Sequence, residues 1–511
     1  MTNDRRSALA GYDGMSAYVG DLHNHCGISY GHGSVEDAYA NARLQLDFAT
    51  VTGHAWWHDM PADDELEPLR RYHEEGFARL ADCWDHVQDV TEAVHSAGDF
   101  VSFLSFEWHS MTYGDHCVYY KGARGPLFRS GSLEELRAEL RSLASAGTPA
   151  MVLPHHVGYL RGWRGANWDA FRRELTPLVE VMSMHGCAMS DDGPRPYLHT
   201  MGPVDGASTV SHALGAGLRF GIIGSTDHHS AHPGSHGYGR AMVWAPDLTR
   251  DGLWSSFQER RTYAVTGDPI VVATAVNGSP MGSEISATGS REIGVDVRGL
   301  DLIDSVEVYR NDELLHVARS APAQPGGPFR GVLGMSVGWG KLEEEIDWDV
   351  QIRLEDGRIL AVEPRLHGFD VVAPSDHAPD TYAVSSWGQT AAAEVWLRTS
   401  TSGNPTVTSD ATQGLALEVE CGPAARLVVE ANGVEVSCSV VELLEGSRTG
   451  YVGGFVSGGI KLHRAVADAS RRVTLDITDQ GSGLPVDRYS CHVRQRNEQH
   501  AWTSPTWVSA T

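Results

Sequence analysis

The sequence predicts a mixed α/β fold in its first half, either an α/β barrel or a doubly wound sheet, followed by a β-sandwich-like C-terminal region. Short apolar runs alternate with helical patterns up to about residue 265, and after that point short strand patterns and turn signals replace them. Histidine is uneven as well, because 19 of the 25 histidines lie before residue 240. The first half therefore combines a layered α/β fold with an unusually high content of histidine.

The first half shows both kinds of element. Ser34 with Asp37, and Ser132 with Glu135, have the spacing of helix-capping boxes, and residues 62–97 carry a long charged amphipathic pattern. Several apolar runs between the helices are continuous, which is typical of buried parallel strands. The expected strands are 17–23, 48–54, 101–107, 117–121, 150–155, 178–183, 220–225 and 241–244.

The second half reads as short antiparallel strands. Asn277-Gly278 and Asp356-Gly357 are turn signals, and Asn432-Gly433 predicts a tight hairpin. We expect a barrel over residues 1–267 and a β-rich region over 268–511, which can divide into 268–365 and 366–511. The expected strands are 271–276, 293–297, 305–309, 349–354, 393–397, 415–419, 427–431, 434–438 and 473–477.

Bulk properties exclude several classes of protein. The formal charge of -26 argues against nucleic acid or an acidic membrane as the main partner. Seven scattered cysteines without a C-x-x-C argue against a disulfide framework and a zinc ribbon. The N-terminus has no apolar signal segment and no run reaches the roughly 18 apolar residues of a membrane span. We expect a cytoplasmic protein that acts on a small molecule. The β-rich half is expected to pack on the barrel, where it can either shape the pocket or mediate the formation of a homo-oligomer.

The stretch Gly20-Asp21-Leu22-His23-Asn24-His25 follows the first expected strand. Residues two apart in a strand point to the same side, so His23 and His25 can reach one metal ion together. Asp21 lies on that side as a third ligand or as a residue that orients the histidines.

Similar polar residues recur at the ends of the other expected strands. In a parallel barrel the carboxyl ends of all strands lie at the same face, so most of these side chains are expected to meet at one rim. Nitrogen and carboxylate donors suit Zn, Mn or Fe. The sequence therefore predicts a multinuclear metal site. The candidate segments hold His23, His25 and His32; His54; Glu107 and His109; Asp115 and His116; His155 and His156; Glu180 and His185; and Asp227, His228 and His229.

These motifs resemble those of the PHP (polymerase and histidinol phosphatase) superfamily in order and spacing. The resemblance is carried by Asp21-Leu22-His23-Asn24-His25, Thr52-Gly53-His54, Glu107, His116, His155-His156 and Asp227-His228-His229. Phe106-Glu107-Trp108, Gly224 to His229, Arg260 to Gly267 and the C-terminal Trp502-Thr503-Ser504-Pro505 are similar to the DUF3604 branch. Gly53 stands where the family usually has Asp.

The resemblance implies a distorted (β/α)7 TIM-like barrel that holds two or three divalent metal ions (Zn, Mn or Fe). One ion is expected to take His23, His25, Glu107 and Asp227. A second shares Glu107 and takes His116 with either His155 or His156. A third takes His32, His54 and His229.

Such a site predicts a multinuclear metal-dependent hydrolase that uses a metal-activated water. A phosphoester of a small molecule is the first candidate substrate, an amide or ester bond is the second, and a metal-bound binding or regulatory module without turnover is the third. The residues expected to take part in catalysis are Glu107, Asp227, His229 and His185. The residues expected to bind substrate are Arg240, Arg261, Tyr113 and His109, with Arg164 as a further cation for a phosphate.

Overall fold

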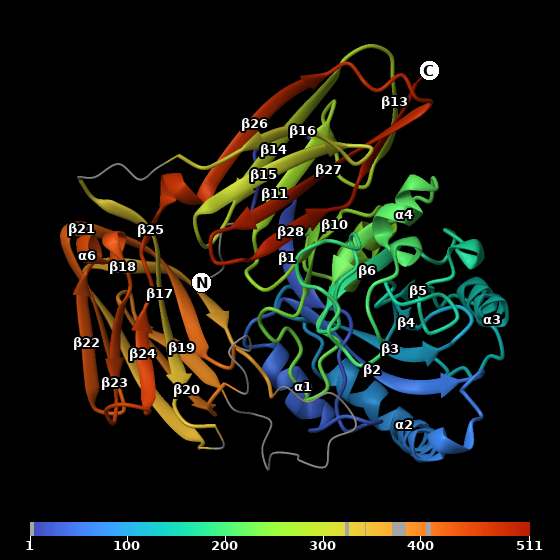
Figure 1. The fold of residues 1–511 in the computed structure, drawn as a ribbon, viewed down its shortest axis with the longest axis horizontal. Coiled ribbons are helices and arrows are strands. Elements are labelled where there is room, and N and C mark those ends of the chain that lie inside the picture. Colours follow the sequence, from blue (N-terminus) through green and yellow to red (C-terminus); the bar gives the residue numbers. More distant parts are fainter. Residues whose placement is uncertain (1–4, 322–326, 343, 370–384, 405–409, 511) are drawn as a thin grey trace.

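The computed structural model describes residues 5–321, 327–342, 344–369, 385–404 and 410–510 as a strand-rich, mixed α/β protein (Figure 1). Its largest sheet has 13 strands. Figure 1 shows three parts: an α/β part with β1 to β10 at the lower right, an upper β part with β11 to β16 and β26 to β29, and a lateral β part with β17 to β25 at the left.

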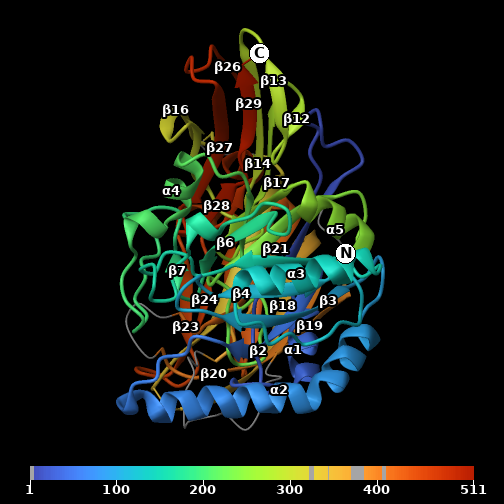
Figure 2. The same ribbon diagram turned by 90° about the vertical axis from the view of Figure 1, so that its right-hand side faces the viewer.

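The α/β part confirms the expected strands and helices to within a few residues. Helix α1 begins after Ser34 and α3 after Ser132, as their capping patterns predict. Helices α2 and α3 lie on the outside of this part (Figure 2). Its elements are β1 (Ser16–Asp21), α1 (Val35–Ala42), β2 (Phe48–Trp57), η1 (Asp64–Leu66), α2 (Glu67–Ala93), β3 (Val101–His109), β4 (His116–Tyr120), α3 (Leu133–Ser145), β5 (Ala150–Pro154), η2 (Trp168–Ala170), β6 (Leu178–Ser183), β7 (Gly186–Cys187), η3 (Gly206–Ser208), α4 (Val210–Gly215), β8 (Gly221–Gly224), β9 (Arg240–Ala245), α5 (Arg250–Gln258) and β10 (Thr262–Val265).

The strands of the α/β part are only partly parallel to one another. Strands β1, β2 and β3 run parallel, whereas β4 pairs antiparallel with β3 and β5, and β9 pairs antiparallel with β1. Strand β6 pairs with β7 and β8 in a separate three-stranded sheet. Hydrogen bonds among the described strands therefore do not close this part into a barrel, and the closed (β/α)7 barrel stays a prediction.

The upper β part is a sandwich of two sheet surfaces. A four-stranded sheet, β12-β11-β14-β26, faces the end of the 13-stranded sheet, and their apolar side chains share one core that includes Val295, Val306 and Val493. Its elements are β11 (Val271–Val276), β12 (Ser279–Pro280), β13 (Glu284–Ala287), β14 (Arg291–Arg298), β15 (Ile303–Arg310), β16 (Glu313–Ala318), η4 (Asp468–Arg471), β26 (Arg472–Asp479), β27 (Val486–Gln495), β28 (His500–Thr503) and β29 (Thr506–Ala510).

The lateral β part is a nine-stranded antiparallel sheet with its own apolar core. Asn432-Gly433 forms the expected hairpin, with both residues at positive φ. Its elements are β17 (Phe329–Trp339), β18 (Ile346–Arg365), β19 (Ser386–Ala391), β20 (Glu394–Thr401), β21 (Gln413–Ala431), β22 (Val434–Ser439), α6 (Val440–Glu445), β23 (Arg448–Tyr451), β24 (Gly458–Leu462) and β25 (Val466–Ala467).

Two expectations for the lateral part are wrong. The segments 415–419 and 427–431 belong to one strand, β21, because β18 pairs along its whole length. Asp356-Gly357 is a bulge within β18, where the register shifts between Glu355 and Gly357, and does not form a turn between strands.

The 13-stranded sheet crosses the boundary expected at residue 267, because β10 pairs with β28. The division into residues 1–267 and 268–511 stays a prediction. All seven cysteines are free thiols, as their spacing predicts. Among the described residues, no helix combines the length and apolar character needed to cross a lipid bilayer.

Candidate metal centre

Histidine and carboxylate side chains gather where β1, β2, β3, β5 and β8 end. The parallel strands β1 to β3 present their ends at the same edge, and the sheet register places His54 directly opposite Glu107. An isolated bridge between Asn24 and His228 joins the segment after β1 to the segment after β8. All the gathered side chains are buried. The backbone pairing therefore brings together residues that lie about 200 positions apart in the chain.

Three ligand-type atoms converge at the centre of this cluster. His25 Nε2 lies 3.1 Å from His23 Nε2 and 3.1 Å from Asp227 Oδ1, and His23 Nε2 lies 3.4 Å from the same Asp227 oxygen. Two imidazole nitrogens and a carboxylate oxygen in this arrangement form a typical ligand set for a transition metal or zinc ion.

Four further groups of the described residues have ligand atoms close enough to share one ion. They overlap with the central group and with one another, so the cluster is continuous. The groups are His25, His54 and His229; His54, Glu107 and His109; Glu107, Asp115, His155 and His156; and His23, Glu107, Cys117 and His155.

Glu107 lies between these groups. Its Oε1 is 3.0 Å from His155 Nε2, and its Oε2 is 2.9 Å from His54 Nδ1 and 3.3 Å from His25 Nε2. Burial disfavours its charge, but the surrounding histidines outweigh burial and hold the pKa of Glu107 well below its ordinary value. Glu107 is therefore a carboxylate in contact with both sides of the cluster.

Three histidines of the cluster favour the neutral form. Burial lowers the pKa of His54 and His155 well below the ordinary value for histidine and lowers the pKa of His229 to about 3. His23 differs, because burial opposes its charge but the neighbouring carboxylates, Asp227 first, outweigh burial and raise its pKa. Neutral imidazole is the form that binds metals, and ionised carboxylate is the other ligand form. The protonation states of His54, His155, His229 and Glu107 thus match those of metal ligands.

Several histidines have Nδ1 engaged, which leaves Nε2 available toward the cluster. His23 Nδ1 lies 2.9 Å from Glu180 Oε2, His229 Nδ1 lies 2.8 Å from the Asp227 carbonyl oxygen, and His116 Nδ1 lies 2.9 Å from the Gly114 carbonyl oxygen. Metal-binding histidines commonly use one nitrogen in this way, because the hydrogen bond fixes the tautomer and the ring orientation.

Asp21 orients the site from inside the protein. Its carboxylate accepts backbone N–H groups from His23 (3.0 Å), Thr226 (3.1 Å) and Gly234 (2.8 Å). Asp21 is not among the converging ligand groups. It therefore links the end of β1 to the segment after β8. Asp227 itself has a φ of +53°, a strained conformation for a residue other than glycine, which such a link helps to maintain.

Unpartnered polar atoms test whether a metal fits. Among the described residues, the ring nitrogens His54 Nε2 and His25 Nδ1 are buried and make no hydrogen bond. A buried polar atom without a partner costs about 1–3 kcal/mol, and a bound cation would supply the missing partner of a neutral ring nitrogen. The donor set and these orphaned atoms fit divalent ions.

Two predicted ligands lie outside the converging groups. His116 is buried beside them, at the start of β4. His32 is partly exposed and donates its backbone N–H to the His229 carbonyl oxygen at 2.8 Å. The structure brings Asp115 to the position expected for His116, and His25 to the group expected to contain His32. The roles of His32 and His116 as ligands stay predictions.

The residues expected to bind substrate differ in whether they lie near the metal cluster. Arg240 is fully buried and donates to the Gly234 carbonyl oxygen and to Gln45 Oε1. Its guanidinium therefore links two segments in the interior of the protein. Arg261 contacts Glu259 and Ser256 on α5 and the turn that follows it. Tyr113 packs near Trp108 and His58. Among the described residues, the hydrogen bonds of these two arginines go to groups outside the cluster.

His109 and His185, by contrast, contact the cluster directly. His109 Nε2 lies 3.1 Å from His54 Nδ1. His185 Nε2 lies 2.9 Å from Asp227 Oδ2, and its Nδ1 lies 2.7 Å from the Tyr159 hydroxyl.

Arg164 and Asp115 form a contact that the sequence does not specify. Arg164 Nε donates to Asp115 Oδ2 at 2.7 Å, its Nη2 contacts the same oxygen, and its guanidinium lies 4.8 Å from the centre of the Trp57 ring. Burial opposes its charge, but Asp115 outweighs burial and raises the pKa of Arg164. The only local sequence feature that points to this contact is the position of Asp115 next to the candidate ligand His116. Arg164 lies in a loop where no sequence motif marks it.

Comparisons with known proteins place few constraints on identity. No family model matches the chain. Uncharacterized proteins of Chlamydia trachomatis (serovar D) and Chlamydia muridarum are 30% identical over 171 residues and 27% identical over 169 residues; each match covers 30% of this chain. The chain spans 27% of the length of these relatives.

A solved structure shows a partial likeness to this chain. It is a two-domain protein from Bacteroides vulgatus that contains a predicted PHP-like metal-dependent phosphoesterase, with 12% identity and a TM-score of 0.30 over 60% of this chain and 83% of that one. A likeness of this extent does not establish a shared fold.

Proposed function

We propose that this protein is a metal-dependent hydrolase of the PHP type. The observation that carries the proposal is the convergence of His23 Nε2, His25 Nε2 and Asp227 Oδ1 within 3.1–3.4 Å of one another, beside the carboxylate of Glu107. The resemblance of the sequence motifs to the PHP superfamily supports the same proposal. Two or three divalent ions, Zn, Mn or Fe, would be held by the five overlapping groups.

Bound divalent ions would supply a water of lowered pKa and would polarise the bond under attack. The protein holds the geometry for this chemistry. Glu107 keeps its two oxygens toward different groups of histidines, and Asp21 and Glu180 fix the position and tautomer of His23. Because the side chains of the centre are buried, they are shielded from bulk water.

His185 is the residue placed to move a proton. It contacts Asp227 through Nε2 and the Tyr159 hydroxyl through Nδ1, so one ring joins the cluster to a hydroxyl outside it. The ionised Asp227 carboxylate can only accept, so Nε2 carries the hydrogen of this contact, and Nδ1, beside the Tyr159 hydroxyl, is the nitrogen that can accept a proton. His229, Glu107 and Asp227 contact the same centre as proposed ligands.

A phosphoester of a small molecule is the substrate we propose. Arg164 supports this choice because its guanidinium is charged, is joined to the cluster through Asp115, and directs Nη1 only toward the Met201 sulfur at 3.3 Å among the described residues. A thioether is a weak acceptor, so Nη1 is available to an oxygen of a phosphate.

Hydrolysis of an amide or ester is the second candidate. Five buried carboxyl groups lie in or beside the centre, those of Asp21, Glu107, Asp115, Glu180 and Asp227, and Arg164 is the arginine in contact with it among the described residues. The pKa values of Glu107, Asp115 and Asp227 are lowered, so three ionised carboxylates face one arginine, which favours a substrate without a full phosphate charge.

The test is a hydrolysis panel with metal analysis on the same purified protein. Phosphate mono- and diesters are compared with matched carboxylic esters and anilides, before and after chelation and after readdition of Zn, Mn or Fe. We expect metal-dependent release from the phosphoesters. Cleavage of the carbonyl substrates alone would select the second candidate, and bound metal without turnover on any substrate would favour a binding or regulatory module.

A further inference from the structure

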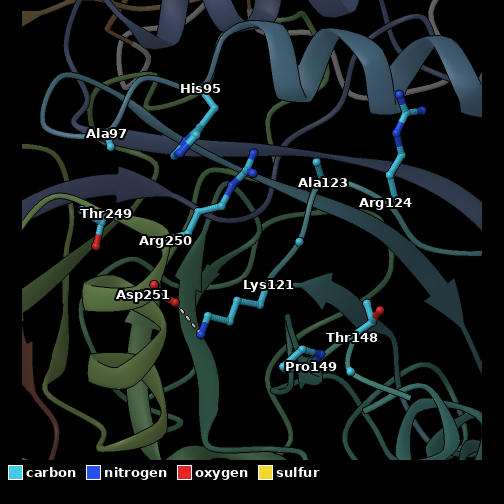
Figure 3. A pocket seen from close by; sticks show the side chains of 12 residues that line it. His95, Ala97, Lys121, Ala123, Arg124, Thr148, Pro149, Thr249, Arg250 and Asp251 are labelled. Atoms are coloured by element: carbon cyan, nitrogen blue, oxygen red, sulfur yellow. Dashed lines mark ion pairs between the residues drawn. The ribbon is translucent and has the colours of Figure 1, made fainter. Parts of the chain in front are cut away.

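We propose that the protein has a second ligand site, for a small multiply charged oxyanion such as a phosphate or diphosphate group. The site lies near the end of strand β4, whereas the metal centre lies near its start. The site is a cavity of about 740 Å³, within the size range of small-molecule pockets (Figure 3). It lies between the segment after β4, the loops that precede β3 and β5, and the start of α5.

The charge of the lining residues points to an anion. Lys121, Arg124 and Arg250 line the cavity, and Asp251 is the one carboxylate among its lining residues. The partners of Arg124 and Arg250, Asp89 and Glu92, lie outside the lining. The protein as a whole has a formal charge of -26. On such an acidic protein, a cavity lined by three cations and one carboxylate indicates a place where an anion can compete for these pairs.

The first turn of α5 also lines the cavity, through Thr249, Arg250 and Asp251. The N-terminus of a helix carries a partial positive charge that favours anions. Here the helix end adds to the effect of three cationic side chains.

Two of these cations are held only by exposed carboxylates. Lys121 Nζ lies 2.6 Å from Asp251, whose side chain is 85% exposed, and Arg124 contacts Asp89, with both side chains more than 60% exposed. Ion pairs at the surface contribute little to stability, so an oxyanion that contacts both cations can displace these carboxylates.

The side chain of Arg250 is held in one position by hydrogen bonds. Its Nε donates to the Ser102 carbonyl oxygen at 2.8 Å and its Nη1 to Glu92 at 2.7 Å, and its side chain is only 15% exposed. The site thus combines one anchored cation with two that can reorient.

The cavity is separate from the metal centre. Strand β4 begins at His116, beside the metal cluster, and Lys121 follows its last residue, Tyr120. Five residues of strand span roughly 17 Å. An anion bound beside Lys121 therefore does not touch the metal ligands, and this inference does not depend on the proposed hydrolase activity.

The test is calorimetric titration of the metal-loaded protein with methylenediphosphonate, which resists hydrolysis, at constant ionic strength. We expect saturable binding that the double variant Lys121→Gln/Arg124→Gln weakens at least tenfold. The variant Arg358→Gln removes an arginine of similar exposure on the lateral β part and should bind like the unchanged protein. The conservative variant Lys121→Arg/Arg124→Lys should retain binding, which separates charge from folding.

A fourth protein, Glu107→Gln, distinguishes the two sites. Binding that persists in this variant and is lost in Lys121→Gln/Arg124→Gln supports the second site. Binding that is lost in Glu107→Gln and unchanged in the double variant places the anion at the metal centre and overturns the proposal. Absence of saturable binding overturns it as well.

Discussion

Asp268 and Arg365 form a buried two-pronged ion pair between the segment after β10 and the end of β18. Arg365 Nε donates to Asp268 Oδ1 and Nη2 to Oδ2, both at 2.8 Å. Asp268 Oδ2 also accepts hydrogen bonds from Gln495 (2.9 Å) and Asn497 (2.8 Å) in and after β27. One carboxylate therefore joins the α/β part, the upper β part and the lateral β part.

Replacing this carboxylate should destabilise the protein strongly. Asp268→Asn leaves Arg365 charged and buried without its partner, so we expect a loss of about 3–5 kcal/mol in the free energy of unfolding. Chemical denaturation with urea measures the change. As a control, Glu420→Gln removes the exposed partner of Arg358 and should leave the free energy of unfolding nearly unchanged. Equal losses in the two variants would contradict the role given to Asp268.

The contribution of Asp268 should depend on pH. Burial opposes its charge, but Arg365 and His236 outweigh burial and lower the pKa of Asp268 in the folded protein. A lowered folded-state pKa means that its contribution is complete above the unfolded-state pKa of about 3.9 and is lost as the pH falls toward the folded-state value. The difference in unfolding free energy between the unchanged protein and Asp268→Asn should thus be constant near pH 6–7 and shrink below about pH 4. A difference that grows on acidification would refute this sign.

Glu107 should control metal content. Glu107→Gln keeps the shape of the side chain but removes the carboxylate that contacts both sides of the cluster, so we expect fewer bound metal ions and a loss of hydrolysis of at least a hundredfold. Elemental analysis and the ester panel measure both. Glu139→Gln, which changes an acid that contacts Ser130 away from the cluster, should leave metal content unchanged. Full metal content and full rate in Glu107→Gln would remove Glu107 from the site.

Arg164 should separate phosphoesters from neutral esters. Arg164→Met removes a charged donor worth about 1.5–3 kcal/mol, or roughly a ten- to hundredfold loss of kcat/KM on phosphoesters. Metal content should stay the same, and any hydrolysis of neutral esters should be retained. Arg161→Met, at an exposed arginine three positions away, is the matched control. An equal loss on charged and neutral substrates would show that Arg164 acts through Asp115 alone.

Much of the α/β part can be predicted from the sequence because its signals are local. The runs of apolar residues and the capping residues Ser34 and Ser132 determine where β1 to β5, α1 and α3 lie, and His-x-His after β1 marks the centre of the cluster. These features depend only on residues within a few positions of each other.

Features that depend on distant partners could not be predicted in this way. The sequence offers Arg164, Arg240 and Arg261 alike as cations for a phosphate, and only the contact with Asp115, 49 positions earlier, singles out Arg164. Arg240 is buried, and Gln45 and Gly234 accept its hydrogen bonds. The length of β18 and β21 follows from their pairing with each other, which no local pattern specifies. The same holds for the antiparallel direction of β4.

The pairing of β10 with β28 has a consequence for how the chain reaches this structure. Val265 and Ala501 are neighbours in the sheet although they are more than 200 residues apart. Closing a loop of that size is entropically costly, so this edge forms late and folding is expected to be slow. Until β28 arrives, β10 presents unpaired N–H and C=O groups that can pair with another chain. Self-association during refolding should therefore start at this edge, and a fragment that stops at residue 267 would carry it permanently.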